Sequence, residues 1–348
     1  MGIAASAKPA AREAVGAAES GQPAAQGAAG AAESGQPAAQ EAVGAAASAQ
    51  GAAQGAAGAA ESGQPAARQI MDIAGLERRL AQYVMTSADN ALQADYALRD
   101  EIVGTPLFDA PIVGCASADD PLFARMKSDD QIIGDTLRLP ADWLPGARSV
   151  IAIFYPFSEQ VRKSNWDNLG VPSDEWLHGR IEGHDFIHAT DRMVAGWLAD
   201  EGYRTCIPAL DPSLVIRKRD PEDAVDRPMF VSSWSERHAA FAAGLGTFGL
   251  SAHLITRVGK AGRFGSIITD AVFSPTPRPY GEDPYAYCTR CGACAKRCPV
   301  DALSLETGKD FQTCWVYMEE TKIRFKPRYG CGKCQLLVPC ETGIPAGR

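Results

Sequence analysis

The sequence predicts a mixed α/β core between about residues 71 and 275, preceded by a disordered repeat and followed by a cysteine-rich module. Three observations lead to this prediction. Apolar runs of strand length alternate with amphipathic stretches of helical period after residue 71. An Ala-, Gly- and Pro-rich repeat fills the first 68 residues, and eight of the ten cysteines fall between Cys288 and Cys340. We therefore expect three segments, 1–70, 71–280 and 281–348.

The N-terminal segment repeats with a period of 14 residues. The run Glu-Ser-Gly-Gln-Pro-Ala-Ala begins at Glu19, Glu33 and Glu61. Gly and Pro interrupt the helix that Ala favours, and few large apolar side chains are present to offset the entropy of ordering. We expect residues 1–70 to be disordered, and the alternative is a tether or targeting arm. Met71 opens the first stretch with a core-like pattern.

The core segment contains strands and helices in alternation. The run from Ser149 to Tyr155 is continuously apolar, which suits a strand buried on both faces. Asp72 can cap a helix that starts at Ile73, and Ser235 can cap another that starts at Glu236. The other expected elements are strands at 110–116, 204–207, 229–232 and 266–269 and a helix at 184–201.

The cysteine spacing indicates iron–sulfur clusters. The run Cys288-x-x-Cys291-x-x-Cys294-x-x-x-Cys298-Pro299 has the ferredoxin spacing, in which the fourth cysteine binds the other cluster. By that topology we assign one [4Fe–4S] cluster to Cys288, Cys291, Cys294 and Cys340, and a second to Cys298, Cys314, Cys331 and Cys334. Two zinc sites are the alternative, because four cysteines can also hold zinc.

Sequence composition also indicates in which compartment the protein is expected to function. No apolar run reaches the roughly 18–20 residues that a membrane helix needs, and no signal peptide is visible. Cluster thiols must stay reduced, so we expect a cytoplasmic protein with no membrane partner. The net charge of −8 argues against a broadly basic nucleic-acid binder but allows a local basic surface. Lys322, Arg324, Lys326 and Arg328 would form such a stripe if extended, and a solvated loop is the alternative.

The motifs, taken in order, resemble the epoxyqueuosine reductase family, which is related to reductive dehalogenases. The resemblance is based on three segments together with the cysteine module: Ala243-Gly-Leu-Gly-Thr-Phe-Gly249, Gly265-Ser-Ile-Ile-Thr-Asp270 and Tyr329-Gly-Cys-Gly-Lys-Cys334-Gln. The resemblance implies a corrinoid-reductase-like core that holds cobalamin and receives electrons from the clusters. It also implies a low-potential electron donor of ferredoxin or flavodoxin type, and tRNA as the substrate-bearing partner.

The resemblance points to particular residues. Gly183-His184-Asp185-Phe186 matches a family motif whose aspartate is the general acid, although the family has Arg at the position of His184. N-capping of the following helix would also explain Asp185. Gly244 and Gly246 would let a planar macrocycle approach, or would serve only as turn residues. Arg237 and His238 would contact the corrinoid or its phosphate tail, or would face solvent.

Three functions remain open at this point. The first is a corrinoid-dependent reductase acting on epoxyqueuosine or another reducible substrate. The second is an electron-transfer protein whose α/β domain docks to a partner without chemistry of its own. The third, a reductive dehalogenase, is disfavoured because such enzymes are usually exported. Leu250, where the enzyme commonly has Lys, and the long Cys334–Cys340 spacing mark a divergent relative.

Overall fold

The computed structural model describes residues 72–220 and 228–347. The predicted disorder of residues 1–70 lies outside the described residues. The described part belongs to one compact unit, so the core and the cysteine-rich module pack together. No helix among the described residues is long and apolar enough to cross a membrane.

A four-stranded sheet forms the centre of the core. Its strand order is β1-β2-β8-β3, and every neighbouring pair is antiparallel. The strands are β1 (Ile112–Ser117), β2 (Ser149–Pro156), β8 (Gly262–Thr269) and β3 (Thr205–Cys206). Each residue of β2 is buried, so the prediction of a strand covered on both faces is confirmed. The antiparallel direction is a feature that the sequence pattern did not specify.

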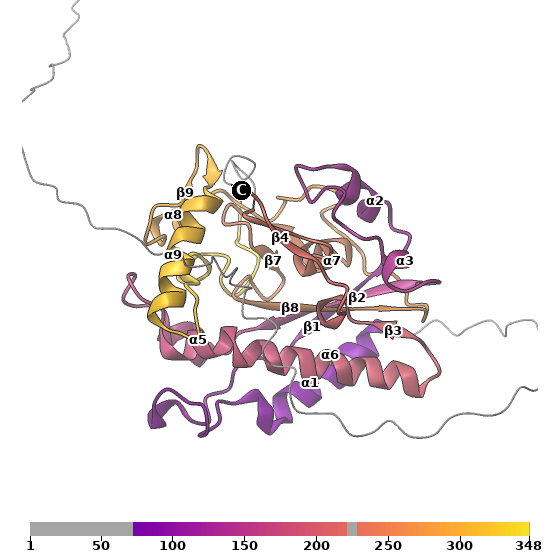
Figure 1. The fold of residues 1–348 in the computed structure, drawn as a ribbon, viewed down its shortest axis with the longest axis horizontal. Coiled ribbons are helices and arrows are strands. Elements are labelled where there is room, and N and C mark those ends of the chain that lie inside the picture. Colours follow the sequence, from indigo (N-terminus) through magenta and orange to yellow (C-terminus); the bar gives the residue numbers. More distant parts are fainter. Residues whose placement is uncertain (1–71, 221–227, 348) are drawn as a thin grey trace, which may run out of the picture. The chain divides into compact units, whose positions relative to one another are not determined.

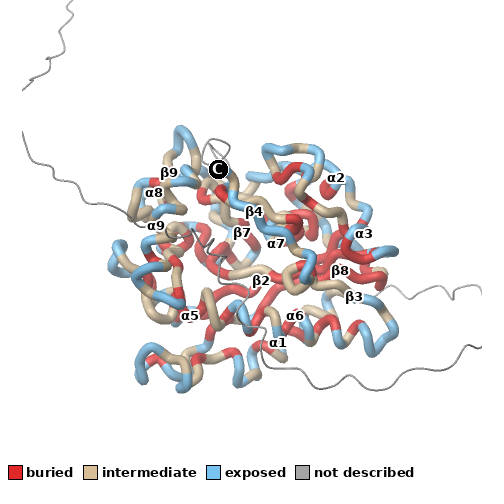
Figure 2. Tube along the Cα trace, in the orientation of Figure 1, coloured by how far each residue is buried: buried red, intermediate tan, exposed pale blue. Residues whose placement is uncertain are grey.

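Helices cover both faces of this sheet, which gives the mixed α/β fold that the sequence predicts (Figure 1). On one face lie α1 (Ile73–Thr86) and α6 (Glu182–Asp200), whose apolar side chains pack on the odd-numbered residues of β2. On the other face, α7 (Glu236–Ala242) packs on the even-numbered ones, together with α2 (Pro121–Ser128) and α3 (Pro140–Trp143). Figure 2 shows the buried sheet between the two partly exposed layers.

The remaining elements frame the cysteine-rich module and its contact with the core. The two further helices on the core side are α4 (Glu159–Ser164) and α5 (Asp174–Arg180). Two-stranded ribbons are formed by β4 (Ile216–Lys218) with β5 (Phe230–Ser232), by β6 (Gly246–Phe248) with β7 (Leu254–Thr256), and by β9 (Leu303–Ser304) with β10 (Gly308–Lys309). The module also contains α8 (Ala293–Lys296) and α9 (Phe311–Arg324), and 3-10 turns occur at 88–90, 100–102, 208–210 and 333–335.

The helix starts confirm one predicted cap and correct two others. Asp72 accepts hydrogen bonds from the backbone of Ala74 and Gly75, as expected. Ser235 makes no such bond, because its hydroxyl lies 2.7 Å from Nδ1 of His238. Asp185 is not a cap either, because α6 begins three residues earlier and the Asp185 amide already donates to the Ile181 carbonyl.

Candidate functional site

The first predicted cysteine group lines one small cavity. Cys288, Cys291, Cys294 and Cys340 all border it, beside the buried Lys260. The Lys260 ammonium donates to Ser251 at 3.1 Å, and its charge lowers the pKa of Cys340 against the larger rise caused by burial. The backbone amide of Leu250 donates to the Cys288 sulfur at 3.4 Å. These four thiols therefore converge from segments up to 52 residues apart, with a cation and an amide placed against them.

The second predicted group also comes together. Burial, with smaller contributions from the nearby Cys334, Cys314 and Cys298, raises the pKa of Cys331 to about 12, so all four thiols lie within electrostatic range. The amide of Ala302 donates to the Cys298 sulfur at 3.2 Å. Buried thiols with such high pKa values become ligands only when a metal or cluster replaces the proton. Among the described residues, no set of three or more His, Cys, Asp or Glu is arranged to hold a single metal ion.

Buried polar contacts fix the loop of the second group against the core. Lys333, between Cys331 and Cys334, is 1% exposed and donates to Asn165 O, Asn165 Oδ1 and Asp167 O at 2.9, 2.7 and 2.9 Å. Asn165 Nδ2 in turn donates to the Cys331 carbonyl at 2.9 Å. The segment after α4 is therefore part of the site, although no sequence motif marks it.

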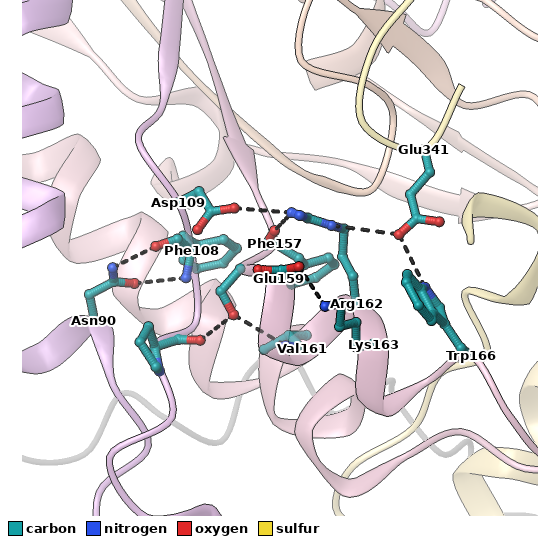
Figure 3. Close-up of polar contacts among 12 residues, drawn as sticks. Asn90, Phe108, Asp109, Phe157, Glu159, Val161, Arg162, Lys163, Trp166 and Glu341 are labelled. Carbon is teal, nitrogen blue, oxygen red and sulfur yellow. Dashed lines mark hydrogen bonds and ion pairs between the residues drawn. The ribbon is translucent and has the colours of Figure 1, made fainter. Parts of the chain in front are cut away.

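Next to this loop, a second network joins the segment after the last cysteine to the core (Figure 3). Glu341 accepts a hydrogen bond from Trp166 Nε1 at 3.2 Å and lies 3.6 Å from Arg162 Nε. Arg162 also pairs with Asp109 at 3.0 Å. Both cysteine groups are thus anchored to the same helix–loop segment that follows β2.

A cavity of about 940 Å³ lies between the core and the cysteine-rich module. Cys288 of the first group borders it, together with Cys298, Cys314, Cys331 and Cys334 of the second. Its walls carry many aromatic side chains, and Phe230 and Trp315 meet edge to face there with ring centroids 4.5 Å apart. This volume is at the upper end of small-molecule sites, so the cavity can enclose a large cofactor or substrate group.

The cavity is strongly basic, although the whole chain carries a net charge of −8. Six arginines and one lysine border it, and Glu282 is the single acidic residue among the described residues that do so. Arg180 and Arg263 belong to this set and have no recognisable sequence signature. Only the fold brings them, from α5 and β8, to the same wall.

Arg237 and His238 both border the cavity. Burial lowers the pKa of His238 to about 3, with a further contribution from the charge of Arg237. The imidazole is therefore neutral near pH 7 and can act as a hydrogen-bonding or ligating group. Arg237 donates from Nη1 to the Ala252 carbonyl at 2.5 Å, which holds it at the wall.

Gly244 and Gly246 do not border the cavity, and the protein's own backbone accounts for both. A Cβ on Gly246 would lie 2.0 Å from the Ile255 carbonyl oxygen across the β6–β7 pair. Gly244 has a φ of +79°, which favours glycine at the end of α7. The alternative interpretation of the two glycines as turn and packing residues is thus sufficient to explain them, and their role in admitting a macrocycle stays a prediction. Gly249, the next glycine of the motif, does border the cavity.

Asp185 is exposed in the first turn of α6 and is not among the residues that border the cavity. Partial burial and the neighbouring Glu182 raise its pKa, and Arg192 acts in the opposite direction. The preceding residue, His184, lies within electrostatic range of Arg180 and Arg263, which do border the cavity.

The expected basic stripe from Lys322 to Arg328 does not form. Lys322 and Arg324 lie in α9, and Arg328 is 8% exposed because it pairs with Glu182 of α6. A helix does not project alternate residues to one side, so the extended-chain assumption was wrong.

The comparisons with known proteins agree with the cysteine chemistry. Residues 285–304 match the 4Fe-4S binding domain family. Over 212 residues the chain is 28% identical to epoxyqueuosine reductase of Staphylococcus aureus (strain NCTC 8325 / PS 47), covering 58% of this chain and 50% of that protein. It thus spans about half the length of the curated relative it matches.

Solved structures with similar backbones include two classes of reductase. Epoxyqueuosine reductase from Streptococcus thermophilus is 16% identical with a TM-score of 0.43, covering 80% of this chain and 68% of that one. A catabolic reductive dehalogenase is 16% identical with a TM-score of 0.43, covering 79% of this chain and 37% of that one.

The fold and the matched cysteine segment define an iron–sulfur protein with a mixed α/β core and a C-terminal ferredoxin-like region. Within that class, the chain is similar to epoxyqueuosine reductase. The resemblance predicted from the motifs is thereby confirmed.

Proposed function

We propose that this chain is an iron–sulfur reductase of the epoxyqueuosine reductase type, with two [4Fe–4S] clusters beside a corrinoid-binding cavity. One observation carries the proposal: cysteines from both four-cysteine groups border the same cavity of about 940 Å³. Electron carriers placed against a ligand-sized cavity suit a reductase, in which a bound substrate receives the electrons. A small electron-transfer protein has no need of such a cavity.

The two clusters would be held as the ferredoxin spacing predicts, with Cys340 completing the first group and Cys298 the second. The cations near the thiols fit this assignment, because a cluster with four thiolates carries negative charge. Lys260 lies near the first group and Lys333 near the second. Hydrogen bonds from the amides of Leu250 and Ala302 to cysteine sulfurs are of the kind that tunes cluster potentials.

The cavity also fits a corrinoid in size and in chemistry. Aromatic side chains would pack on the macrocycle, Gly249 would leave room for its edge, and the neutral His238 and charged Arg237 would bind its polar groups. When bound, the corrinoid would supply a reducible metal centre of high nucleophilicity. The chain itself would exclude water, orient the substrate and provide a proton.

Asp185 is our proposed proton donor. An opened epoxide leaves an alkoxide, and a carboxyl with a raised pKa can protonate it. Epoxyqueuosine in tRNA is the proposed substrate, a ferredoxin or flavodoxin the proposed electron donor, and the cytoplasm the proposed location. The electron-transfer alternative requires the clusters but neither the corrinoid nor Asp185.

Anaerobic purification followed by metal analysis tests the proposal. We expect about eight iron and eight sulfide per chain, as two cubane clusters require. Cys331→Ser should lower the iron content, whereas Cys206→Ser, a half-buried cysteine outside both groups, should not. Bound cobalt after incubation with cobalamin would support the reductase. Stoichiometric zinc would contradict the clusters, and iron without any corrinoid affinity would favour the electron-transfer alternative.

A further inference from the structure

Three arginines from different elements meet on one wall of the large cavity. Arg180 ends α5, Arg237 lies in α7 and Arg263 lies in β8. Burial lowers the pKa of Arg237 and of Arg263, and the charge of Arg180 lowers both pKa values further by a smaller amount. The three charges are therefore close enough to repel one another.

These arginines lack the carboxylate partners that the protein supplies elsewhere. Among the described residues, Arg125 pairs with Glu282 at 3.3 Å and Arg278 with Asp120 at 2.8 Å. None of the three cavity arginines has such a pair within the described ranges 72–220 and 228–347. The Nε atoms of Arg180 and Arg263 are buried without any hydrogen-bond partner in that part of the chain.

The orientation of the three groups is nevertheless fixed. The Arg180 guanidinium stacks on the Tyr329 ring at 4.1 Å, and Arg263 lies over Phe157 at 5.6 Å. Arg237 is held by the Ala252 carbonyl. Ring stacking uses the face of a guanidinium and leaves donors in its plane available, although Arg180 also hydrogen-bonds the side chain of Tyr329. The wall is thus preorganised: three positive charges lie close together, two of them half-buried, with no carboxylate among the described residues paired to them.

We propose that Arg180, Arg237 and Arg263 form a binding site for a phosphate-type oxyanion carried by the ligand of this cavity. This inference depends on one part of the proposed function, namely that the cavity is the site where the ligand binds. A phosphate offers several oxygens to three guanidinium forks, and arginine is the side chain that best matches this geometry. Arg237 lies within electrostatic range of Cys334, so the anion would anchor its ligand next to the second cysteine group.

Two ligands could carry the phosphate. The first is the corrinoid, whose nucleotide loop contains a phosphodiester. The second is a nucleic-acid substrate. The chemistry recognised by the arginines is the same, and binding experiments can separate the two sources.

Inorganic phosphate is the first probe, used on anaerobically purified, cluster-loaded protein. Phosphate should raise the melting temperature of the wild type relative to chloride at equal ionic strength, which controls for screening. Arg180→Gln, Arg237→Gln and Arg263→Gln should each weaken phosphate binding at least roughly tenfold, since each removes charged donors. Arg125→Gln is the matched control, because Arg125 borders the same cavity but is already paired.

The proposal is overturned if the three variants bind phosphate as tightly as the wild type. It is also overturned if they lose iron or shift the cluster potentials while phosphate never binds the wild type. In that case the arginines would serve only to balance cluster charge. Unchanged iron content in the variants, with weakened phosphate binding, supports the site.

Corrinoid and RNA binding then identify the source. If the arginine variants bind cobalamin more weakly but bind cobinamide, which lacks the phosphodiester loop, as the wild type does, the corrinoid carries the anion. If both corrinoids bind normally and a tRNA stem loop binds more weakly, the substrate carries it. If wild-type protein binds no corrinoid, the proposed function fails, and the phosphate measurement still decides the arginine site.

Discussion

Asp185 lies one residue from His184, whose surroundings include two arginines of the cavity wall, yet its own side chain is exposed. The structure removes the capping explanation, because α6 starts at Glu182. A carboxylate in a first helical turn is worth only about 0.3–1 kcal/mol through the helix dipole. Asp185 therefore has little structural role, and its proposed chemical role can be tested without loss of folding.

Asp185→Asn should slow epoxide reduction by roughly 10²–10⁴, the usual contribution of a general acid. The raised pKa gives a sign to the pH dependence: the acid works only while protonated, so the rate should fall as pH rises through that pKa. The variant should lack this falling limb. Asp200→Asn, at the exposed far end of α6, is the control. Wild-type turnover by Asp185→Asn would leave water as the proton source.

At the scale of elements, the loop between Cys331 and Cys334 depends on a buried ammonium. Burial lowers the pKa of Lys333 to about 8, and three oxygens of Asn165 and Asp167 accept its protons. Lys333→Met keeps the length of the side chain but leaves these buried acceptors unsatisfied. We expect a loss of about 1–3 kcal/mol of stability and a fall in iron toward one cluster per chain.

Urea unfolding and iron analysis measure the two effects of Lys333→Met. Lys163→Met provides the control, because Lys163 is exposed, pairs with Glu159 one turn away in α4 and otherwise lies at 5.8 Å over the Trp166 ring. If Lys333→Met keeps both its full iron content and its stability, the contacts with Asn165 do not hold the loop.

Some features of the helices, strands and site could be predicted from the sequence, and others could not. The buried strand β2 was predicted from a local pattern, and the convergence of Cys340 with Cys288, Cys291 and Cys294 on one cavity agrees with the ferredoxin spacing. The local sequence pattern predicted a helix that starts at residue 184, whereas α6 starts at Glu182. This difference of two residues was enough to suggest a capping role for Asp185 that the structure does not show. Arg180 and Arg263 could not be found, because only the fold brings the last residue of α5 and the second residue of β8 to the same cavity.

For the whole molecule, charge is distributed unevenly. The chain is acidic overall, but among the described residues six arginines and one lysine border the cavity, against a single carboxylate. Net charge therefore said little about the ligand, because a low-dielectric concave wall concentrates the field of a few cations. The basic lining of the cavity favours an anionic ligand small enough, or protruding enough, to enter it.

The compact unit should not require the N-terminal repeat. A chain beginning at Met71 retains Asp72, the cap of α1, and every apolar residue that the structure places in the core. It should therefore bind its clusters and melt within a few degrees of the full chain.

A chain beginning at Ser87 is the matched control, because it removes α1 with Leu80 and Val84, both 0% exposed against the sheet. Losing two fully buried side chains of this size costs several kcal/mol, so the shorter chain should melt much earlier or fail to fold. Iron content and thermal melting distinguish the three chains. If the chain beginning at Met71 were insoluble or lost iron, the repeat would have a structural role that its composition does not predict.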